Sequence, residues 1–135
     1  MGRSLLILLD THMVVWLAQD YQRISPKAQA AIAGEREKEC GIAVCDITLF
    51  EIALLASRRR VIFRPDVGTT LSEVERQFIV LPVTAKIALQ AFHLPKSYPN
   101  DPADRIIGAT ALVEGLTLVT ADAQIRKSRA IPTLW

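Results

Sequence analysis

Residues 101–122, DPADRIIGATALVEGLTLVTAD, decide the fold class because they join a capped helix, a short apolar strand and several acids. Asp101 followed by Pro102 is a strong helix start, since aspartate is favoured at the N-cap and proline at the first helical position. We expect this helix to run to about Glu114 and to stop at Gly115. The LTLVT stretch that follows predicts a buried strand.

The same alternation of short apolar strands and helices extends over the rest of the chain. Strands are expected at SLLILLD (4–10), GIAVC (41–45), IVLPV (79–83), LTLVT (116–120) and, at an edge, IPTLW (131–135). Helices are expected at 12–19, 25–39, 48–60, 67–78 and 84–92, with a short helix or turn at 121–128. Strands that alternate with helices of about ten residues indicate βαβ units. The sequence therefore predicts one α/β domain over residues 1–135, a three-layer α/β/α structure with a central, mostly parallel sheet of four to five strands.

The bulk composition points to a globular protein of the cytoplasm. Of the 135 residues, 50% are hydrophobic and 22% are charged, and the longest apolar runs fall far short of the roughly 20 residues that a membrane helix needs. The N-terminal apolar run ends in Asp10 with no small-residue cleavage site after it, which argues against a signal peptide. Cys40 and Cys45 are a single pair, so we expect two reduced thiols and not a zinc site.

The charge balance becomes informative only when the acids are considered together. Sixteen basic residues against fourteen acidic ones give a net charge of +2. If metal ions sequestered four of the acids, the remaining surface would carry about +6. A moderately basic surface around an acidic site suits a polyanionic substrate whose phosphate reacts at metal ions.

Four acids stand at the edges of different apolar segments. Asp10 closes the first expected strand, and Asp122 follows the fourth. Glu51 is the only charge in ITLFEIALLA, and Asp104 lies in the first turn of the helix that starts at Pro102. Carboxyl ends of parallel strands share one edge of the sheet, where ligands bind. Carboxylates gathered there repel one another unless protons or hard cations lie between them, which predicts a Mg²⁺ or Mn²⁺ site.

Each acid taken alone also has an ordinary structural explanation. Asp10 and Asp122 can act as helix N-caps, and Glu51 can be exposed or pair with Arg58. Asp101 is expected to cap its helix by accepting a bond from the amide of Asp104, and a functional role is the second interpretation for Asp101.

Other site types are less well supported by the sequence. The chain has no glycine-rich phosphate loop, and its two histidines, His12 and His93, lack metal-ligand spacing with a cysteine. The acids therefore remain the best candidates for catalytic or metal-binding residues.

The ordered set of segments resembles the PIN-domain ribonucleases, in particular the toxins of VapC-type toxin–antitoxin pairs. The resemblance rests on LLDTHMVVWL, ITLFEIALLASRRRV, DPADRIIGATALVEGLTLVTAD and the closing IPTLW, whose order and spacing match over nearly the whole chain. The chain departs from the pattern at Ala103, where relatives often carry an aromatic residue, and at Gly108, where alanine is common. Neither departure removes an acid.

The resemblance implies a PIN-like fold and a Mg²⁺- or Mn²⁺-dependent endoribonuclease toxin that cleaves cellular RNA, forms a homodimer and is neutralised by a cognate antitoxin. It implies that the catalytic residues also hold one or two metal ions, and these residues are Asp10, Glu51, Asp104 and Asp122. Auxiliary roles are implied for Asp101, Thr11 and Thr120. Trp16, Phe50 and Leu54 are expected as anchor points for the antitoxin.

Two alternatives from other classes remain open at this stage. The first is a non-catalytic PIN-fold module that only binds protein or RNA, for which the loss of one or more acids would be expected. The second is a metal-dependent phosphatase, which a small phosphoester substrate would reveal.

Overall fold

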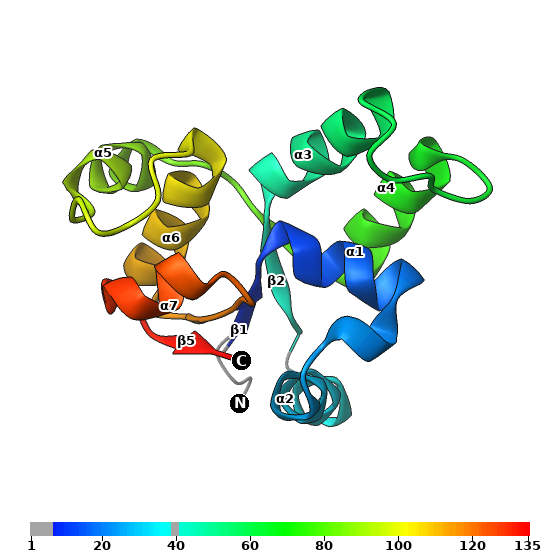
Figure 1. Cartoon of the computed structure of the whole chain (residues 1–135), viewed down its shortest axis with the longest axis horizontal. Coiled ribbons are helices and arrows are strands. Elements are labelled where there is room, and N and C mark those ends of the chain that lie inside the picture. The colour runs from blue at the N-terminus through cyan, green and yellow to red at the C-terminus, as the bar shows by residue number, and fades with distance from the viewer. Residues whose placement is uncertain (1–6, 39–40) are drawn as a thin grey trace.

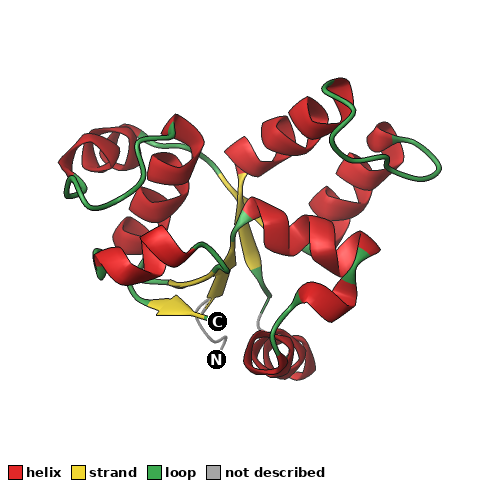
Figure 2. Ribbon diagram, in the orientation of Figure 1, coloured by secondary structure: helices red, strands yellow, loops and turns green. Residues whose placement is uncertain are grey.

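The computed structural model describes residues 7–38 and 41–135, and in these residues five short strands form one parallel sheet (Figures 1 and 2). The strands are β1 (Ile7–Leu9), β2 (Ala43–Cys45), β3 (Ile79–Leu81), β4 (Thr117–Val119) and β5 (Thr133–Leu134). Their order across the sheet is β3-β2-β1-β4-β5, and every neighbouring pair is parallel. The expected α/β class is confirmed, with β5 at an edge as the sequence predicted.

Seven α-helices connect or follow the strands in the described part of the chain. They are α1 (Thr11–Gln19), α2 (Pro26–Glu37), α3 (Asp46–Ser57), α4 (Val67–Gln77), α5 (Ala85–His93), α6 (Pro102–Glu114) and α7 (Ala123–Ser128). Ser25 caps α2 by accepting a hydrogen bond from the amide of Ala28, and Asp101 caps α6 in the same way. Gly115 ends α6 in the left-handed conformation, with φ of 69°. A short 3₁₀ helix, Tyr21–Arg23, was not predicted.

The sheet separates two layers of helices, so the central strands β1, β2 and β4 are largely buried on both faces, whereas the edge strands β3 and β5 are partly exposed. Leu9, Val44 and Val119 face a core that they share with α1 to α4, whereas Leu8 and Leu118 face a core that they share with α6 and α7. Figure 1 shows α1 to α4 on one side of the strands and α5 to α7 on the other. This arrangement accounts for the continuous apolar character of the strand sequences.

Some expectations need correction or fall outside the description. The predictions for residues 4–6, Glu39 and Cys40 lie outside the described residues, while Cys45 is a buried free thiol. The helix expected at 48–60 begins earlier, at Asp46, and ends at Ser57, because Arg59 takes a positive φ of 53° that a right-handed helix cannot contain. In the part of the chain that the structure describes, no helix has the length and apolar character of a membrane span.

Candidate active site

Five acids lie together at one edge of the sheet, and we call them the acidic edge. They come from the carboxyl ends of β1 and β4, the middle of α3 and the first turn of α6. Its members are Asp10, Glu51, Asp101, Asp104 and Asp122. Each of their charges influences at least one other carboxyl of the group, as the electrostatics below describe. The sequence prediction that acids from separate segments meet at this edge agrees with this arrangement.

Asp10 directly follows β1 and is almost fully buried, with 8% of its surface exposed. One carboxylate oxygen accepts a hydrogen bond from the backbone N–H of Thr11 at 2.8 Å. The other accepts from the hydroxyl of Thr120 at 2.7 Å. Thr120 comes directly after β4, so the neighbouring strands β1 and β4 together fix the orientation of this carboxylate.

Glu51 is oriented by a pair of buried threonines. The Thr11 hydroxyl donates to a Glu51 carboxylate oxygen, with 2.5 Å between the two oxygens. The same Thr11 oxygen lies 3.0 Å from the hydroxyl oxygen of Thr48, one turn before Glu51 on α3. Glu51 is partly buried and forms no ion pair with Arg58. The alternative explanation, an ion pair on the surface of α3, is therefore wrong.

The first turn of α6 presents two aspartates in different roles. Asp101 is exposed, and its side chain accepts a hydrogen bond from the backbone N–H of Asp104 at 3.1 Å. Asp104 is partly buried, and its backbone carbonyl accepts a hydrogen bond from the Tyr98 hydroxyl at 2.8 Å. The Asp101 carboxylate therefore caps α6, whereas the Asp104 carboxylate does not take part in the cap and can bind a ligand.

Asp122 caps α7, as its ordinary structural explanation predicted. Its side chain accepts from the backbone N–H of Ile125 at 3.0 Å, and its own N–H donates to the Thr120 hydroxyl oxygen at 3.1 Å. Thr120 thus lies between Asp10 and Asp122 and bonds to both residues. Thr11 and Thr120, the two threonines for which the resemblance implies auxiliary roles, thus both hydrogen-bond members of the acidic edge.

The electrostatics of the acidic edge favour protonation or a bound cation. Burial, followed by repulsion from Asp10, Asp101, Glu51 and Asp122, raises the pKa of Asp104 to about 7. Burial also raises the pKa of Asp10, against the lowering effect of the Thr120 hydrogen bond. Glu51 behaves similarly: burial raises its pKa and the Thr11 hydrogen bond opposes the rise. Carboxyls perturbed in this way are typical of functional sites.

Lysine and arginine side chains do not neutralise these acids, although His12 acts electrostatically to lower the pKa of Asp10 and Glu51 against the larger effect of burial. Within residues 7–38 and 41–135, no lysine or arginine forms an ion pair with any member of the acidic edge. Arg105, the neighbour of Asp104, points its guanidinium to backbone carbonyls instead. It donates to the carbonyl oxygens of Ala91 at 2.9 Å, Leu94 at 2.7 Å and Pro99 at 3.0 Å. Arg105, the basic residue next to Asp104 in sequence, therefore bonds to α5 and the loop that follows it and forms no ion pair with the acidic edge.

The donor set of the acidic edge fits a hard divalent cation, although it does not form a closed cage. Every carboxylate and hydroxyl donor is oxygen, which Mg²⁺ and Mn²⁺ prefer over nitrogen and sulfur ligands. Among the described residues, no three His, Cys, Asp or Glu side chains converge as a complete metal-binding group. Mg²⁺ keeps several waters and binds through one or two carboxylates, so such a cage is not required.

Three residues that organise the acidic edge were not identified from the sequence. Thr48 had a usable signal, because it lies three residues before Glu51 and so on the same side of a helix. Tyr98 and Arg105 had none, since their roles depend on the course of the loop between α5 and α6.

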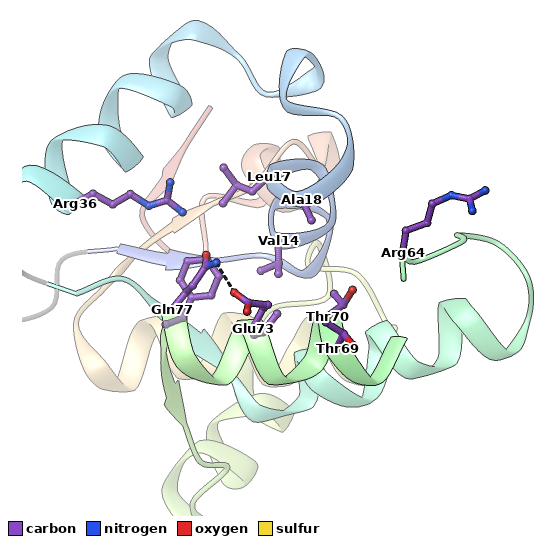
Figure 3. A pocket seen from close by; sticks show the side chains of 11 residues that line it. Val14, Leu17, Ala18, Arg36, Arg64, Thr69, Thr70, Glu73 and Gln77 are labelled. Atoms are coloured by element: carbon purple, nitrogen blue, oxygen red, sulfur yellow. Dashed lines mark hydrogen bonds between the residues drawn. The ribbon is translucent and has the colours of Figure 1, made fainter. Parts of the chain in front are cut away.

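A separate hollow of about 330 Å³ lies between α1, α2 and α4, and no member of the acidic edge lines it. Figure 3 shows Val14, Leu17 and Ala18 facing Thr69, Thr70 and Glu73 across it, with Arg36 and Arg64 at its sides. The hollow combines apolar side chains with polar ones, including the charged residues Arg36, Arg64 and Glu73.

Comparison with known proteins places this geometry in a family. The sequence profile of the PIN domain matches residues 7–130. The chain is 37% identical over 123 residues to Ribonuclease VapC22 of Mycobacterium tuberculosis, a match that covers 91% of this chain and 92% of that protein.

Solved structures share the fold at lower sequence identity. VapBC2 from Rickettsia felis, bound to a DNA fragment from its promoter, superposes with a TM-score of 0.73 at 17% identity, covering 96% of this chain and 98% of the other. DNA-bound VapBC from Salmonella typhimurium gives a TM-score of 0.71 at 19% identity, covering 96% of this chain and 97% of the other.

Proposed function

Because the chain belongs to the PIN-domain family, we propose that it is a metal-dependent endoribonuclease toxin whose acidic edge hydrolyses phosphodiester bonds of RNA. The observation that carries the proposal is the gathering of Asp10, Glu51, Asp104 and Asp122 at one sheet edge without a lysine or arginine counter-ion. The similarity to a curated ribonuclease over nine-tenths of the chain supports RNA as the substrate class.

In this proposal Asp10, Glu51, Asp104 and Asp122 hold one or two Mg²⁺ or Mn²⁺ ions, directly or through water. A divalent ion so bound supplies a water of lowered pKa and offsets the charge of the phosphate. The protein's own part is to fix the carboxylates, since the hydroxyls of Thr120 and Thr11 hold Asp10 and Glu51 in one orientation.

An assay on purified protein tests the catalytic part. A fluorescently labelled unstructured RNA should be cut in the presence of Mn²⁺ or Mg²⁺, and a chelator should abolish the reaction. The Asp104→Asn protein should be inactive under the same conditions. Cutting that continues in chelator would contradict the proposal. Turnover of p-nitrophenyl phosphate without RNA cutting would favour a phosphatase, and binding of RNA without cutting would favour a non-catalytic module.

A thermal measurement tests metal binding without reference to activity. A ligand that binds only the native state at a hundredfold excess over Kd stabilises it by about 2.7 kcal/mol, a rise of several degrees in Tm. Mg²⁺ or Mn²⁺ should produce such a rise in the wild type and a smaller one in Asp104→Asn. An equal rise in both proteins would argue against the acidic edge as the metal site.

The proposal includes a cognate antitoxin as partner. Of the three expected anchors, Phe50 is 61% exposed, Trp16 is partly buried against the core, and Leu54 is partly buried. The hollow in Figure 3, which both apolar and polar side chains line, offers a further place for an amphipathic segment with acidic side chains, which Arg36 and Arg64 would attract.

Co-expression with the product of the adjacent gene tests the antitoxin proposal. Size-exclusion chromatography should yield a stable complex that no longer cuts RNA. A stable complex that cuts RNA at the full rate with Mg²⁺ present would contradict neutralisation by occlusion.

A further inference from the structure

Three cations, which we call the α7 basic face, gather on the last helix of the described chain. Arg126, Lys127 and Arg129 line a hollow of about 210 Å³ together with Ala123, and all four residues are exposed. Within residues 7–38 and 41–135, none of the three cations takes part in an ion pair. A hollow lined by charges of one sign without partners indicates a surface that attracts anions.

The α7 basic face begins where the acidic edge ends. Asp122, a member of the acidic edge, is the N-cap of α7, and the next residue, Ala123, already lines the hollow. Arg126 follows Asp122 by one helical turn, about 5–6 Å of helix axis. Its guanidinium turns back toward the start of α7, where Nη2 donates to the carbonyl oxygen of Ala121 at 3.4 Å. A positive charge therefore lies directly beside the acidic edge.

The neighbouring acid does not cancel this charge. Asp122 is the only acid in residues 115–135. Its carboxylate accepts a hydrogen bond from the amide of Ile125 at 3.0 Å and forms no ion pair with Arg126. Under the proposed function, divalent ions offset the charge of the acidic edge when they bind. A phosphate that reaches those ions would then meet the α7 basic face as the adjoining surface.

The composition of the hollow favours a phosphate backbone over a protein partner. Ala123 is its only uncharged lining residue, and none of the exposed large hydrophobic residues of the described chain lies on α7. Protein interfaces depend on aromatic and aliphatic anchors, and lysine is depleted at their centres. Phosphates are instead bound by the planar fork of arginine and by the point charge of lysine.

A second group of cations provides a comparison within the chain. Residues 58–60 are three exposed arginines at the end of α3. They begin about two helical turns after Glu51, whereas Arg126 is one turn from Asp122. The hollow beside Arg59 is lined otherwise by apolar residues, namely Ala56, Val61, Ile62, Phe63 and Val67. This second group therefore lies further along its helix from the acidic edge and lacks a hollow lined by cations.

We propose that the α7 basic face binds the phosphate backbone of the RNA strand next to the phosphodiester that the acidic edge cleaves. This inference rests on the proposed function and names the surface that holds the substrate in place. A positively charged groove follows a single strand through its phosphates and reads no base. The α7 basic face therefore contributes affinity and the path of the strand, and the same contribution holds for every RNA sequence.

Two matched triple variants of the full chain test the proposal. The α7 variant is Arg126→Gln, Lys127→Gln and Arg129→Asn, and the α3 variant is Arg58→Gln, Arg59→Asn and Arg60→Gln. Each removes three positive charges and so lowers the formal net charge from +2 to −1. Each also replaces one residue of positive φ, 54° at Arg129 and 53° at Arg59, by asparagine, which tolerates that conformation. Only the location of the lost charges differs.

The salt dependence of binding is the readout. A fluorescein-labelled single-stranded RNA is titrated in EDTA, so that no cutting occurs, and anisotropy reports the binding constant. Each phosphate contact to a single strand contributes about 0.7 to the slope of log K against log salt, so the α7 variant should lose about 2 from that slope. Between roughly 50 and 200 mM salt, wild-type affinity should then fall about 20-fold more than that of the α7 variant. The α3 variant should keep the wild-type slope.

Cleavage with Mn²⁺ separates binding from chemistry. The α7 variant should need more RNA to reach its half-maximal single-turnover rate and should reach the wild-type rate at saturation, because the acidic edge is intact. Arg126→Gln alone should lower the salt slope by about 0.7, and Arg126→Lys should retain it. These exposed single substitutions decide the question if the triple variant does not fold.

The outcomes separate this inference from the proposed function. If wild-type protein binds and cuts RNA and the α7 variant keeps the full salt slope, the inference is wrong and the nuclease proposal stands. A slope lost only in the α3 variant would place the strand along the end of α3 and overturn the inference. It is also overturned if the α7 variant binds RNA unchanged but no longer forms a complex with the co-expressed product of the adjacent gene. If wild-type protein neither binds nor cuts any RNA, the proposed function itself fails.

Discussion

The acidic edge and a hollow of about 230 Å³ between α5 and α6, which we call the α5–α6 pocket, share the first turn of α6, yet their chemistry is opposite. Four of the five carboxylates of the acidic edge are partly or almost fully buried, and burial and mutual repulsion raise the pKa of Asp104 to about 7. The pocket is apolar, and acids are absent from the segment between Glu75 and Asp101 that forms α5 and the following loop. The carboxylates of the acidic edge and the apolar lining of the α5–α6 pocket are thus only one helical turn apart.

This difference suggests a division of labour that kinetics can measure. Groups that act on the reacting phosphate should affect kcat, whereas groups that only bind the substrate away from that phosphate should affect KM. If variants on both sides of α6 lowered kcat alone, the two surfaces would not be separate in function. The predictions below examine the acidic side, from the largest expected effect to the smallest.

The largest effect is expected from removal of a single inner acid. Asp10→Asn, Glu51→Gln, Asp104→Asn and Asp122→Asn should each lower RNA cleavage by more than roughly a hundredfold, because even the partners of metal ligands are worth about 10- to 100-fold. Double variants should lose little more than single ones, since residues that serve one site act as a unit. Single-turnover cleavage rates provide the measurement, and additive losses in the double variants would contradict a shared site.

The next effect concerns pH and the stability of the metal-free protein. The pKa of Asp104 rises from an ordinary 3.8 to about 7, so the native state keeps a proton that the unfolded chain loses. The resulting stabilisation is complete below about pH 4 and disappears as pH rises to about 7. Asp10 and Glu51, whose pKa values are also raised, contribute in the same direction.

Urea unfolding in EDTA between pH 4 and pH 8 measures this dependence. The free energy of unfolding should fall more steeply with pH in the wild type than in Asp104→Asn, because the amide does not titrate. Asp66→Asn is a suitable control, since Asp66 caps α4 outside the acidic edge. Identical slopes in wild type and Asp104→Asn would show that Asp104 does not carry the extra proton.

Much of the fold could be predicted from the sequence because its signals are local. Ser25 with Pro26 marks the start of α2, Asp101 with Pro102 marks that of α6, and Gly115 marks its end. The acids at the ends of β1 and β4 were predictable because parallel strands share one edge. These inferences need only neighbouring residues and one topological rule.

Other features were not predictable because they depend on how distant segments meet. The Thr11–Thr48–Glu51 contacts join residues about 40 positions apart, and Arg105 finds its carbonyl partners only after the loop from Leu94 has closed. The α5–α6 pocket also had no sequence signal, because an amphipathic helix such as α5 normally turns its phenylalanine inward. Long-range packing therefore decides the details of the site.

A moderate effect is expected where α6 meets the Tyr98 ring. A Cβ at Gly108 would lie 2.3 Å from the Tyr98 hydroxyl oxygen, so Gly108→Ala should displace the ring and destabilise the protein by about 1–3 kcal/mol. Gly34→Ala is the matched control: nothing lies within 4 Å of its Cβ position in α2, and the change should stabilise by roughly 0.5–1 kcal/mol. Chemical denaturation of both variants provides the comparison, and equal effects of the same sign would contradict it.

The smallest effect separates the two aspartates of the first turn of α6. Asp101 accepts the amide hydrogen of Asp104 as an N-cap, so Asp101→Ala should lower stability by about 1 kcal/mol. Asp101→Ser, which keeps a capping oxygen, should restore most of that loss. Cleavage should fall far less than in Asp104→Asn, because the exposed Asp101 carboxylate is already used by the backbone. If Asp101→Ala abolished cleavage while Asp104→Asn spared it, the roles of the two aspartates would be reversed, and Asp101 would have to be counted among the metal ligands.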